Sequence, residues 1–319
     1  MCTADSIKQA ANLLKAGNLV AFPTETVYGL GADASNARAV AKIYAAKARP
    51  ADHPLIVHIA SMDRMGDWAS EVPEYAIKLA RDFWPGPMTL ILKRSQLAQD
   101  FITGGQGTVG LRVPDHAVAL ALLNAFEKIG GKGVAAPSAN RFGHVSPTSA
   151  SAVVEELAQY LSSEDLVLDG GPCAVGVEST IIDCTGKSPR ILRPGAISQE
   201  MVAHSTGLEA NSGFTSTEKI EEIRVSGSLE NHYSPAAQVY LDQVPQVGQG
   251  FIALAQIQTP DGVIRLASPA TNDEFARILY SSLRAADTQG LTELVVMQPR
   301  GAGIAEAIRD RLARAANGR

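Results

Sequence analysis

The sequence predicts two domains: an α+β domain with a mixed sheet over about residues 1–205, and a small α/β domain over residues 238–319. The chain has 319 residues, more than the roughly 100 to 200 residues of one ordinary domain. Helical and strand patterns mix in the first part, with several short strand-like spacings late in it. From about residue 206 to 228 the pattern dissolves into a polar stretch with Gly and Ser, so we predict a linker over residues 206–237.

The first domain is predicted to open with a helix followed by a strand. Apolar residues recur at helical spacing from Ile7 to Leu14, and Gly17 with Asn18 ends this helix before an apolar strand at residues 19–22. Further strands are expected at residues 55–59, 89–93, 109–113, 134–136, 166–168, 179–183 and 190–192. Helices are expected between them at about 37–48, 73–83, 116–129 and 148–161.

The second domain is predicted from alternating elements after the linker. Strands are expected at residues 238–241, 250–256 and 294–297, and helices at residues 273–286 and 302–316. Such alternation within about 80 residues is typical of a small α/β domain. No internal repeat is visible.

Composition excludes several classes of protein. Apolar residues make up 45% and charged residues 19%, a globular balance, and the 5% of aromatics leaves a mainly aliphatic core. The formal net charge of −5 argues against a main role in holding a long nucleic-acid backbone, although a local basic pocket for phosphates is compatible with it.

Cysteine usage and hydropathy indicate a reduced, soluble setting. Cys2, Cys173 and Cys184 form no CxxC pair and have no histidine at ligand spacing, so we expect no disulfide framework and no bound metal. No apolar run approaches the roughly 18 residues of a membrane span, and the first residues have the pattern of an amphipathic helix. The sequence therefore predicts a cytoplasmic protein without membrane contact.

The segment VAFPTETVYGLG, residues 20–31, is the first candidate for chemistry. It places Thr24, Glu25 and Thr26 directly after a strand, at the carboxyl end where open α/β sheets bind ligands, and Gly29 and Gly31 would let the backbone turn closely. A capped turn before a helix explains the same residues equally well.

Three more polar clusters follow predicted elements. Lys47 and Arg49 end a helix, where dipole complementarity is the simpler explanation, and His53 and His58 flank the next strand, where a structural histidine is the commoner finding. Ser138 and Asn140 lie in a turn sequence, AAPSAN, which is not a nucleophile elbow.

Arginine provides the last cluster. Thr108 and Arg112 are four apart on one strand and are expected to face one cavity, although a surface ion pair is the common alternative for such an arginine. Ser179 and Arg193 lie near two further strand ends. Arg49, Arg112 and Arg193 with several hydroxyls suit a substrate that carries both carboxylate and phosphate groups.

Taken together, these segments resemble a known family. The motifs FPTETVYGLG, KAR, PLIVH, WPGPMT, AAPSAN, GVEST and LRPG closely resemble those of the YrdC-like threonylcarbamoyl-AMP synthases over about residues 5–200. HYSP, residues 232–235, followed by a small α/β domain, is similar to the long two-domain form. The resemblance implies a YrdC-like α+β fold followed by a Rossmann-like α/β domain.

The resemblance also implies a reaction. A nucleotidyltransferase of this family joins L-threonine, bicarbonate or CO2 and ATP into L-threonylcarbamoyl-adenylate and releases pyrophosphate. A partner transferase then modifies adenosine 37 of tRNAs that read codons beginning with A. The expected partners are thus ATP, L-threonine, bicarbonate or CO2 and that transferase, with room for a weak tRNA contact, and Mg²⁺ would arrive with the ATP phosphates.

Residue roles follow from the motif match. Threonine would be surrounded by Thr26, His58, Arg112, Ala136 and Ser179, with Arg112 as the partner of its carboxylate. ATP would be surrounded by Arg49, His53, Thr108, Ser138, Ser146, Arg193 and Tyr233. Lys47, Arg49, Ser138 and Asn140 would form the catalytic signature, and positioning with charge neutralisation would replace a covalent nucleophile. His53 departs from the small amide expected there. Tyr233 lies beyond the polar stretch of residues 206–228, so the linker would fold back over the pocket as a lid.

Two rival functions are considered. A non-catalytic factor that binds structured RNA in ribosome or tRNA maturation conflicts with the acidic balance and with the lack of an RNP-like aromatic motif. A carbamoyl-transfer domain of the hydrogenase-maturation type would normally come with acylphosphatase and zinc-finger segments, which this chain has neither the cysteine pattern nor the length to contain.

Overall fold

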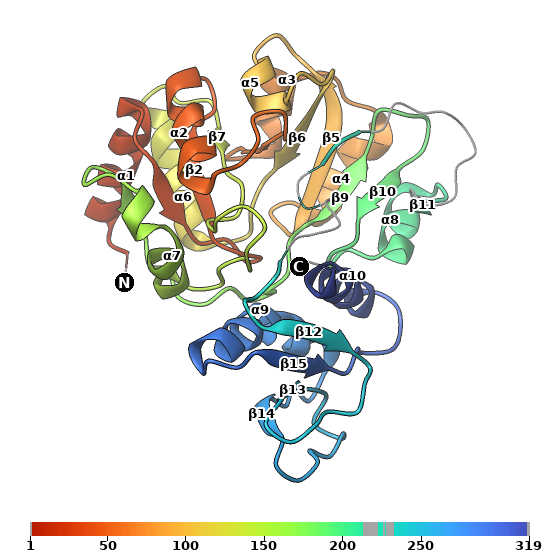
Figure 1. The fold of residues 1–319 in the computed structure, drawn as a ribbon. Coiled ribbons are helices and arrows are strands. Elements are labelled where there is room, and N and C mark those ends of the chain that lie inside the picture. Colours follow the sequence, from red (N-terminus) through yellow and green to blue (C-terminus); the bar gives the residue numbers. More distant parts are fainter. Residues whose placement is uncertain (1, 213–222, 226, 228–232, 318–319) are drawn as a thin grey trace.

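A computed structural model describes residues 2–212, 223–225, 227 and 233–317, and it shows a large sheet domain above a smaller one (Figure 1). The first domain is a twisted mixed sheet with helices, and the second is built on a parallel sheet. The predicted fold class, α+β followed by a small α/β domain, is therefore confirmed.

The large sheet carries the strands that position the pocket. Its order is β11-β10-β9-β5-β6-β3-β7-β2-β1-β8, with β4 beside β5. The bounds are β1 Val20–Phe22, β2 Gly29–Asp33, β3 Ile56–His58, β4 Ala69–Glu71, β5 Met88–Arg94, β6 Thr108–Arg112, β7 Val134–Ala135, β8 Leu166–Val167, β9 Thr180–Asp183, β10 Arg190–Arg193 and β11 Asn211–Ser212. β3 runs parallel to β6 and β5 runs parallel to β9, whereas β7 pairs antiparallel with both β2 and β3.

Helices cover the large sheet on its outer sides. They are α1 Ala4–Ala16, α2 Ala37–Lys47, α3 Met65–Trp68, α4 Glu74–Phe83, α5 Asp100–Thr103, α6 Ala117–Lys128, α7 Ala150–Leu157 and α8 Gln199–Thr206, with short 3-10 turns at Met62–Arg64 and Ala158–Tyr160. α1 begins at a reciprocal Thr3–Ser6 capping box and ends at Gly17 in the left-handed region, as the sequence indicates. Its buried face packs on α6 and includes Leu14.

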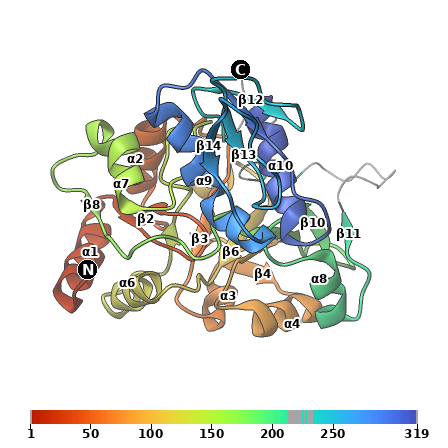
Figure 2. The same ribbon diagram turned by 90° about the horizontal axis from the view of Figure 1, so that it is seen from below.

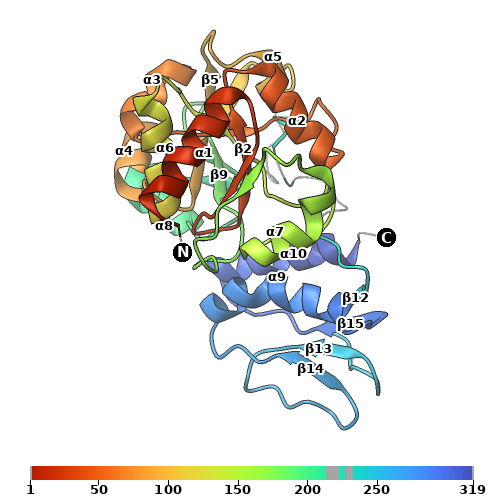
Figure 3. The same ribbon diagram turned by 90° about the vertical axis from the view of Figure 1, so that its left-hand side faces the viewer.

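The second domain has an all-parallel sheet with the order β12-β15-β13-β14. Its strands are β12 Gln238–Leu241, β13 Gly250–Ile252, β14 Ile264–Ala267 and β15 Glu293–Val296, and its helices are α9 Asn272–Thr288 and α10 Ile304–Ala316. Both helices lie between this sheet and the first domain (Figure 3). Viewed from below, the small domain lies in front of the large one (Figure 2).

Four strands, β2, β4, β11 and β14, were not predicted from the sequence. β2 occupies residues predicted to turn: Gly31 is small because a Cβ there would stand 2.8 Å from side-chain atoms of Phe22 and Val134, not because the backbone needs a left-handed angle. β14 was not predicted, since its edge position leaves Ile264 exposed and weakens the apolar pattern. β11 pairs with β10 inside the range predicted as linker, while residues 213–222, 226 and 228–232, including His232 of the HYSP motif, lie outside the described residues.

Across the described residues, no helix combines the length and apolar character needed to cross a membrane.

Candidate active site

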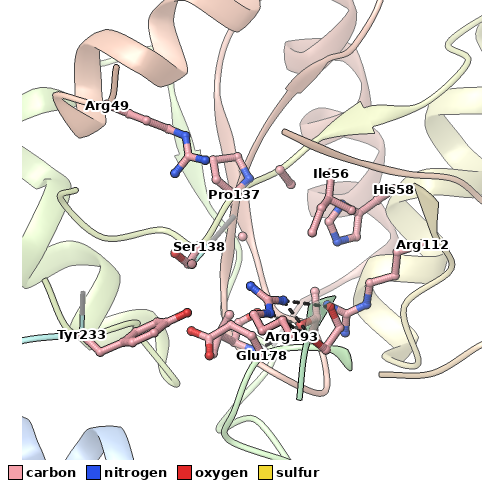
Figure 4. A pocket seen from close by; sticks show the side chains of 15 residues that line it. Arg49, Ile56, His58, Arg112, Pro137, Ser138, Glu178, Arg193 and Tyr233 are labelled. Carbon is pink, nitrogen blue, oxygen red and sulfur yellow. Dashed lines mark hydrogen bonds between the residues drawn. The ribbon is translucent and has the colours of Figure 1, made fainter. Parts of the chain in front are cut away.

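A pocket lies where the ends of several strands of the large sheet meet the segment that joins the two domains. Its lining comprises Thr24, Val27, Gly29, Arg49, Ile56, His58, Arg112, Ala136, Pro137, Ser138, Glu178, Ser179, Arg193, Gly227 and Tyr233. Figure 4 shows that arginines reach this space from different elements. The sequence rule that ligands bind near strand ends thus identifies most of the lining.

The segment after β1 is both a turn and a part of the site. Thr24 Oγ1 accepts hydrogen bonds from the backbone N–H groups of Thr26 and Val27, each at 3.2 Å, and donates to the Val27 carbonyl at 2.7 Å. This closes the capped turn that the sequence allowed. The turn leaves Thr26 Oγ1 beside Arg112, whose Nη2 donates to it at 2.9 Å. The segment is thus a turn, but it leads into β2 rather than into a helix, and Thr24 lines the pocket.

Arg112 ends β6 and is held from one side by a carboxylate. Its Nη2 lies 2.8 Å from Glu25 Oε1, and both side chains are about 95% buried. Within the described part of the chain, no atom accepts a hydrogen bond from Arg112 Nε. The guanidinium is thus fixed by Glu25 and Thr26 and still has donor capacity, which suits the binding of a second carboxylate.

His58, the last residue of β3, is a neutral imidazole. Burial, and after it the charge of Arg112, lowers its pKa to about 3. Its Nδ1 finds no partner among the residues described. At neutral pH this side chain can exchange hydrogen bonds with a ligand but cannot serve as an effective general base.

Lys47 and Asn140 lie beneath the pocket rather than on its wall. Lys47 Nζ donates to the carbonyl of Ser138 at 2.6 Å and to that of Asn140. The Asn140 amide donates to the carbonyls of Arg141 and His144 at 2.7 and 2.8 Å. Burial, and then the nearby Arg49, lowers the pKa of Lys47 well below its usual value. These two side chains fix the loop that presents Ser138.

Arg49 reaches the pocket from the end of α2, where Ala48 caps the helix in the left-handed region with φ of 49°. Its Nη2 donates to the Pro54 carbonyl at 3.0 Å, and its guanidinium lies 5.6 Å from the ring centroid of Phe142. Burial lowers its pKa to about 10, so the group stays cationic at neutral pH. Arg49 is therefore a fixed positive charge on the pocket wall.

The opposite wall is formed by Ser179 and Arg193. Arg193 Nη2 donates to the Ser179 carbonyl at 2.9 Å and to Ser179 Oγ at 3.2 Å, bonds that are dashed in Figure 4. Ser179 Oγ shares a further hydrogen bond of 2.8 Å with Thr89 Oγ1. This network fixes the orientation of the Arg193 cation at the end of β10.

Glu178 is the one lining residue with a carboxylate, and sequence reasoning quoted its motif without assigning it a role. Its Oε2 accepts from Tyr280 Oη at 2.7 Å and from Arg311 Nε at 2.8 Å, and its Oε1 accepts from Ser146 Oγ at 2.7 Å. Burial raises the pKa of this carboxyl, but Arg311 and Arg193 outweigh burial and bring it down to about 2. Glu178 is ionised at neutral pH.

Tyr233, near the end of the predicted linker, lies in the pocket with 1% of its surface exposed. Its ring stacks on that of Tyr280, with centroids 5.6 Å apart and an interplanar angle of 23°. The Arg311 guanidinium lies 5.4 Å from its centroid. Burial raises the pKa of Tyr233 to about 12. Tyr280 and Arg311 carried no signal in the sequence.

Three predicted ATP contacts are set apart from this lining. Thr108 lines a neighbouring hollow with Ile91 and Arg224. It begins the strand that Arg112 ends, and residues four apart on a strand are about 13 Å apart. The expectation that Thr108 and Arg112 face one cavity is therefore wrong. His53 packs edge to face on Phe142 outside the lining, and Ser146 lies behind Glu178. Thr26 is also behind the wall, in contact with Arg112.

Among the described residues, no group of three or more His, Cys, Asp or Glu side chains is arranged to hold a metal ion. The carboxylate of Glu178 is directed at Tyr280, Arg311 and Ser146. A divalent cation would thus have to enter the pocket with its own ligands, such as phosphates.

Known proteins match the chain over both domains. A Sua5–YciO–YrdC family model, described as telomere recombination, matches residues 12–195, and a model described as the C-terminal domain of threonylcarbamoyl-AMP synthase matches residues 197–317. Threonylcarbamoyl-AMP synthases of Pyrococcus abyssi and Bacillus subtilis are each 38% identical, over 97% and 98% of this chain and 93% of theirs. A crystal structure of P. abyssi Sua5 complexed with L-threonine superposes with a TM-score of 0.88 at 36% identity, covering 100% of this chain and 96% of that one.

Proposed function

Because the chain belongs to the threonylcarbamoyl-AMP synthase family of two-domain Sua5 proteins, we propose that its buried pocket is the active site of an L-threonylcarbamoyladenylate synthase. The enzyme joins L-threonine, bicarbonate or CO2 and ATP into the adenylate and releases pyrophosphate. The observation that carries this assignment is the convergence of Arg49, Arg112 and Arg193 on one pocket lined by hydroxyl groups.

The reaction requires two bonds to form. The amine nitrogen of threonine bonds to the carbon of CO2 and loses a proton, which gives a carbamate. A carbamate oxygen then bonds to the α-phosphorus of ATP as the bond from that phosphorus to the β-bridging oxygen breaks, and pyrophosphate leaves with the electron pair. Negative charge gathers on the phosphates in this step, so fixed cations stabilise the transition state more than the separate reactants.

The threonine end of the pocket is proposed to lie at Arg112. Its guanidinium, oriented by Glu25 and Thr26, binds the carboxylate of the amino acid. Ser179 and neutral His58 offer hydrogen bonds to the remaining polar groups of threonine. Ala136 supplies an apolar surface at the end of β7 for the methyl group.

The nucleotide end is proposed to lie between Arg49, Arg193 and Tyr233. The two arginines neutralise phosphate charge, and Ser138 presents a hydroxyl from the loop that Lys47 and Asn140 fix. His53, Thr108 and Ser146 would contact ATP only if the bound nucleotide extends beyond the present lining. Tyr233 would close the pocket as part of the predicted lid over residues 206–237.

Cofactor and partners complete the proposal. Mg²⁺ would enter as the ATP complex and offset phosphate charge beside the arginines. The adenylate, a reactive mixed anhydride, would pass to a transferase that modifies adenosine 37 of tRNA in the cytoplasm. Domain limits of 1–205 and 238–319 remain the proposed division of the chain.

The test is release of pyrophosphate from ATP by the purified protein, with L-threonine and bicarbonate each present or omitted, and mass analysis of the product. Release that needs both, with a threonylcarbamoyl-adenylate mass, is the expected result. Active protein that hydrolyses or binds ATP without any threonine-dependent release would refute the synthase assignment. Binding of structured RNA without ATP or threonine would then support the rival function.

A further inference from the structure

The second domain supports the wall of the pocket from behind, through side chains that contact two of the lining residues. Arg311 lies on α10 and Tyr280 on α9, and both are completely buried against the first domain. They meet Glu178 of the first domain and Tyr233 of the segment that joins the domains. We propose that Arg311 and Tyr280 are positioning residues for the nucleotide half of the active site, acting through Glu178 and Tyr233.

The first step of the argument is electrostatic. Glu178 lines a pocket that must accept a polyanion, so an uncompensated carboxylate there would repel the phosphates and compete for Arg193. Arg311 neutralises it through Nε at 2.8 Å, and the pair is nearly inaccessible to solvent, with exposed fractions of 0% and 8%. Charge screening by water and salt is weak in such a place, so the pairing matters for any anion in the pocket.

The second step is geometric. Arg311 is itself fixed, since its Nη2 donates to the Pro194 carbonyl at 3.0 Å and its Nη1 donates to Asp310. Pro194 directly follows Arg193, so this bond ties α10 to the strand end that carries a proposed phosphate ligand. The same guanidinium therefore neutralises Glu178 and braces the backbone beside Arg193.

The third step concerns Tyr233, whose backbone has a φ of 67°, a region that non-glycine residues adopt only when their surroundings enforce it. The ring of Tyr280 and the guanidinium of Arg311 both contact the ring of Tyr233 and hold it in place. The second domain thus holds the residue that is proposed to close the nucleotide pocket.

This inference rests on the proposed function, and its test separates the two. ATP affinity is measured by calorimetry, and KM for ATP and for threonine by pyrophosphate release, in the full chain and in Arg311→Met. We expect a rise of about tenfold or more in the Kd and KM for ATP, since Glu178 then remains as a buried unpaired charge. The KM for threonine should stay within about twofold, because Arg112 is untouched.

The double variant Glu178→Gln with Arg311→Met tests the electrostatic step. Removal of both charges should restore most of the ATP affinity that the single variant loses, an outcome that a merely structural role of Arg311 would not give. If Arg311→Met does not fold, Arg311→Lys replaces it in these assays; this variant keeps the charge but loses the several N–H donors of the guanidinium. Arg309→Met, on the same helix but bonded to Pro299 within its own domain, is the matched control and should leave both KM values unchanged.

Tyr280 separates stacking from hydrogen bonding. Tyr280→Phe loses only the bond to Glu178 and should change ATP affinity about threefold or less, whereas Tyr280→Leu also loses the stacked ring and should weaken ATP binding further. Equal losses for ATP and threonine, or no recovery in the double variant, would overturn the inference. So would a wild-type protein that binds no ATP. ATP binding without adenylate formation would refute the proposed function alone, because the calorimetric comparison still decides the inference.

Discussion

Replacement of Arg112 by methionine separates the stability of the fold from the recognition of threonine. Arg112 and Glu25 form an ion pair of 2.8 Å with exposed fractions of 5% and 6%. When one partner of such a pair is removed, the other remains as a buried charge, at a cost of about 3 to 5 kcal/mol. We therefore expect Arg112→Met to lower the free energy of unfolding by roughly that amount, because Glu25 is left without its cation.

Threonine binding should fall independently of stability. The loss of charge-assisted hydrogen bonds to the substrate carboxylate costs about 2 to 3 kcal/mol, which corresponds to a rise of roughly 30- to 140-fold in the KM for threonine. The double variant Glu25→Gln with Arg112→Met lacks both charges of this pair, so neither is left buried and unpaired. Stability should then recover by several kcal/mol, while the KM for threonine stays high.

Two assays decide the matter: denaturant unfolding for stability, and pyrophosphate release against threonine concentration for binding. Glu25→Gln alone is the matched control, since it removes the carboxylate charge of the pair and keeps the Arg112 cation. A normal KM for threonine in Arg112→Met would refute the assignment of Arg112 to the carboxylate. A double variant that regains threonine binding would show that Glu25, rather than Arg112, limits affinity.

Three further predictions concern packing and protonation. Gly31→Ala should lower the free energy of unfolding by about 1 to 3 kcal/mol, because a Cβ there would lie 2.8 Å from atoms of Phe22 and Val134. Gly66→Ala is the control and should not lower it, because no atom lies within 4 Å of a Cβ at that position. Equal melting temperatures of the two variants would contradict this prediction. His58 should show no imidazole titration by NMR between pH 5 and 8, since its pKa is lowered to about 3, and a titration near pH 6.5 would refute its neutrality. The pKa of the Glu178 carboxyl is lowered from 4.5 to about 2, so its contribution to folding stability is complete above about pH 4.5 and is lost as the pH falls toward 2. In Glu178→Gln the free energy of unfolding should therefore fall less steeply over that range. Parallel curves for the variant and the wild type would exclude this contribution.

The fold was predictable where short apolar runs end at turns. β1, β3, β5 and β6 are mostly buried on both faces, so apolar residues make up most of each strand. β2 was not predicted, because its sequence GLGAD has glycines where an apolar run would have large side chains. Gly31 is small because a Cβ there would clash with Phe22 of β1 and Val134 of β7, and a local sequence pattern does not reveal such contacts.

The site was predictable to the extent that strand ends define it. Arg112 ends β6, Arg193 ends β10 and Ser179 directly precedes β9, so a rule about strand ends brings them together without knowledge of sheet order. Thr108 was misplaced because it was expected to share a cavity with Arg112 from their common strand face. It begins the strand that Arg112 ends, so the two residues lie at opposite ends of β6.

The contribution of the second domain was beyond sequence reasoning for a different reason. Arg311 meets Glu178 across 133 residues and Tyr280 meets it across 102, and each lies on a helix whose pattern is satisfied by packing alone. An arginine on an amphipathic helix is ordinarily a solvated residue, whereas Arg311 has no exposed surface. Its burial is compensated because a carboxylate, a carbonyl and an aromatic face meet the guanidinium together, at Glu178, Pro194 and Tyr233. Glu178 and Tyr233 line the pocket, and Pro194 directly follows the lining residue Arg193. The contact between the domains therefore holds two residues of the pocket wall in place, and variants in that contact should alter ATP use before they alter threonine use.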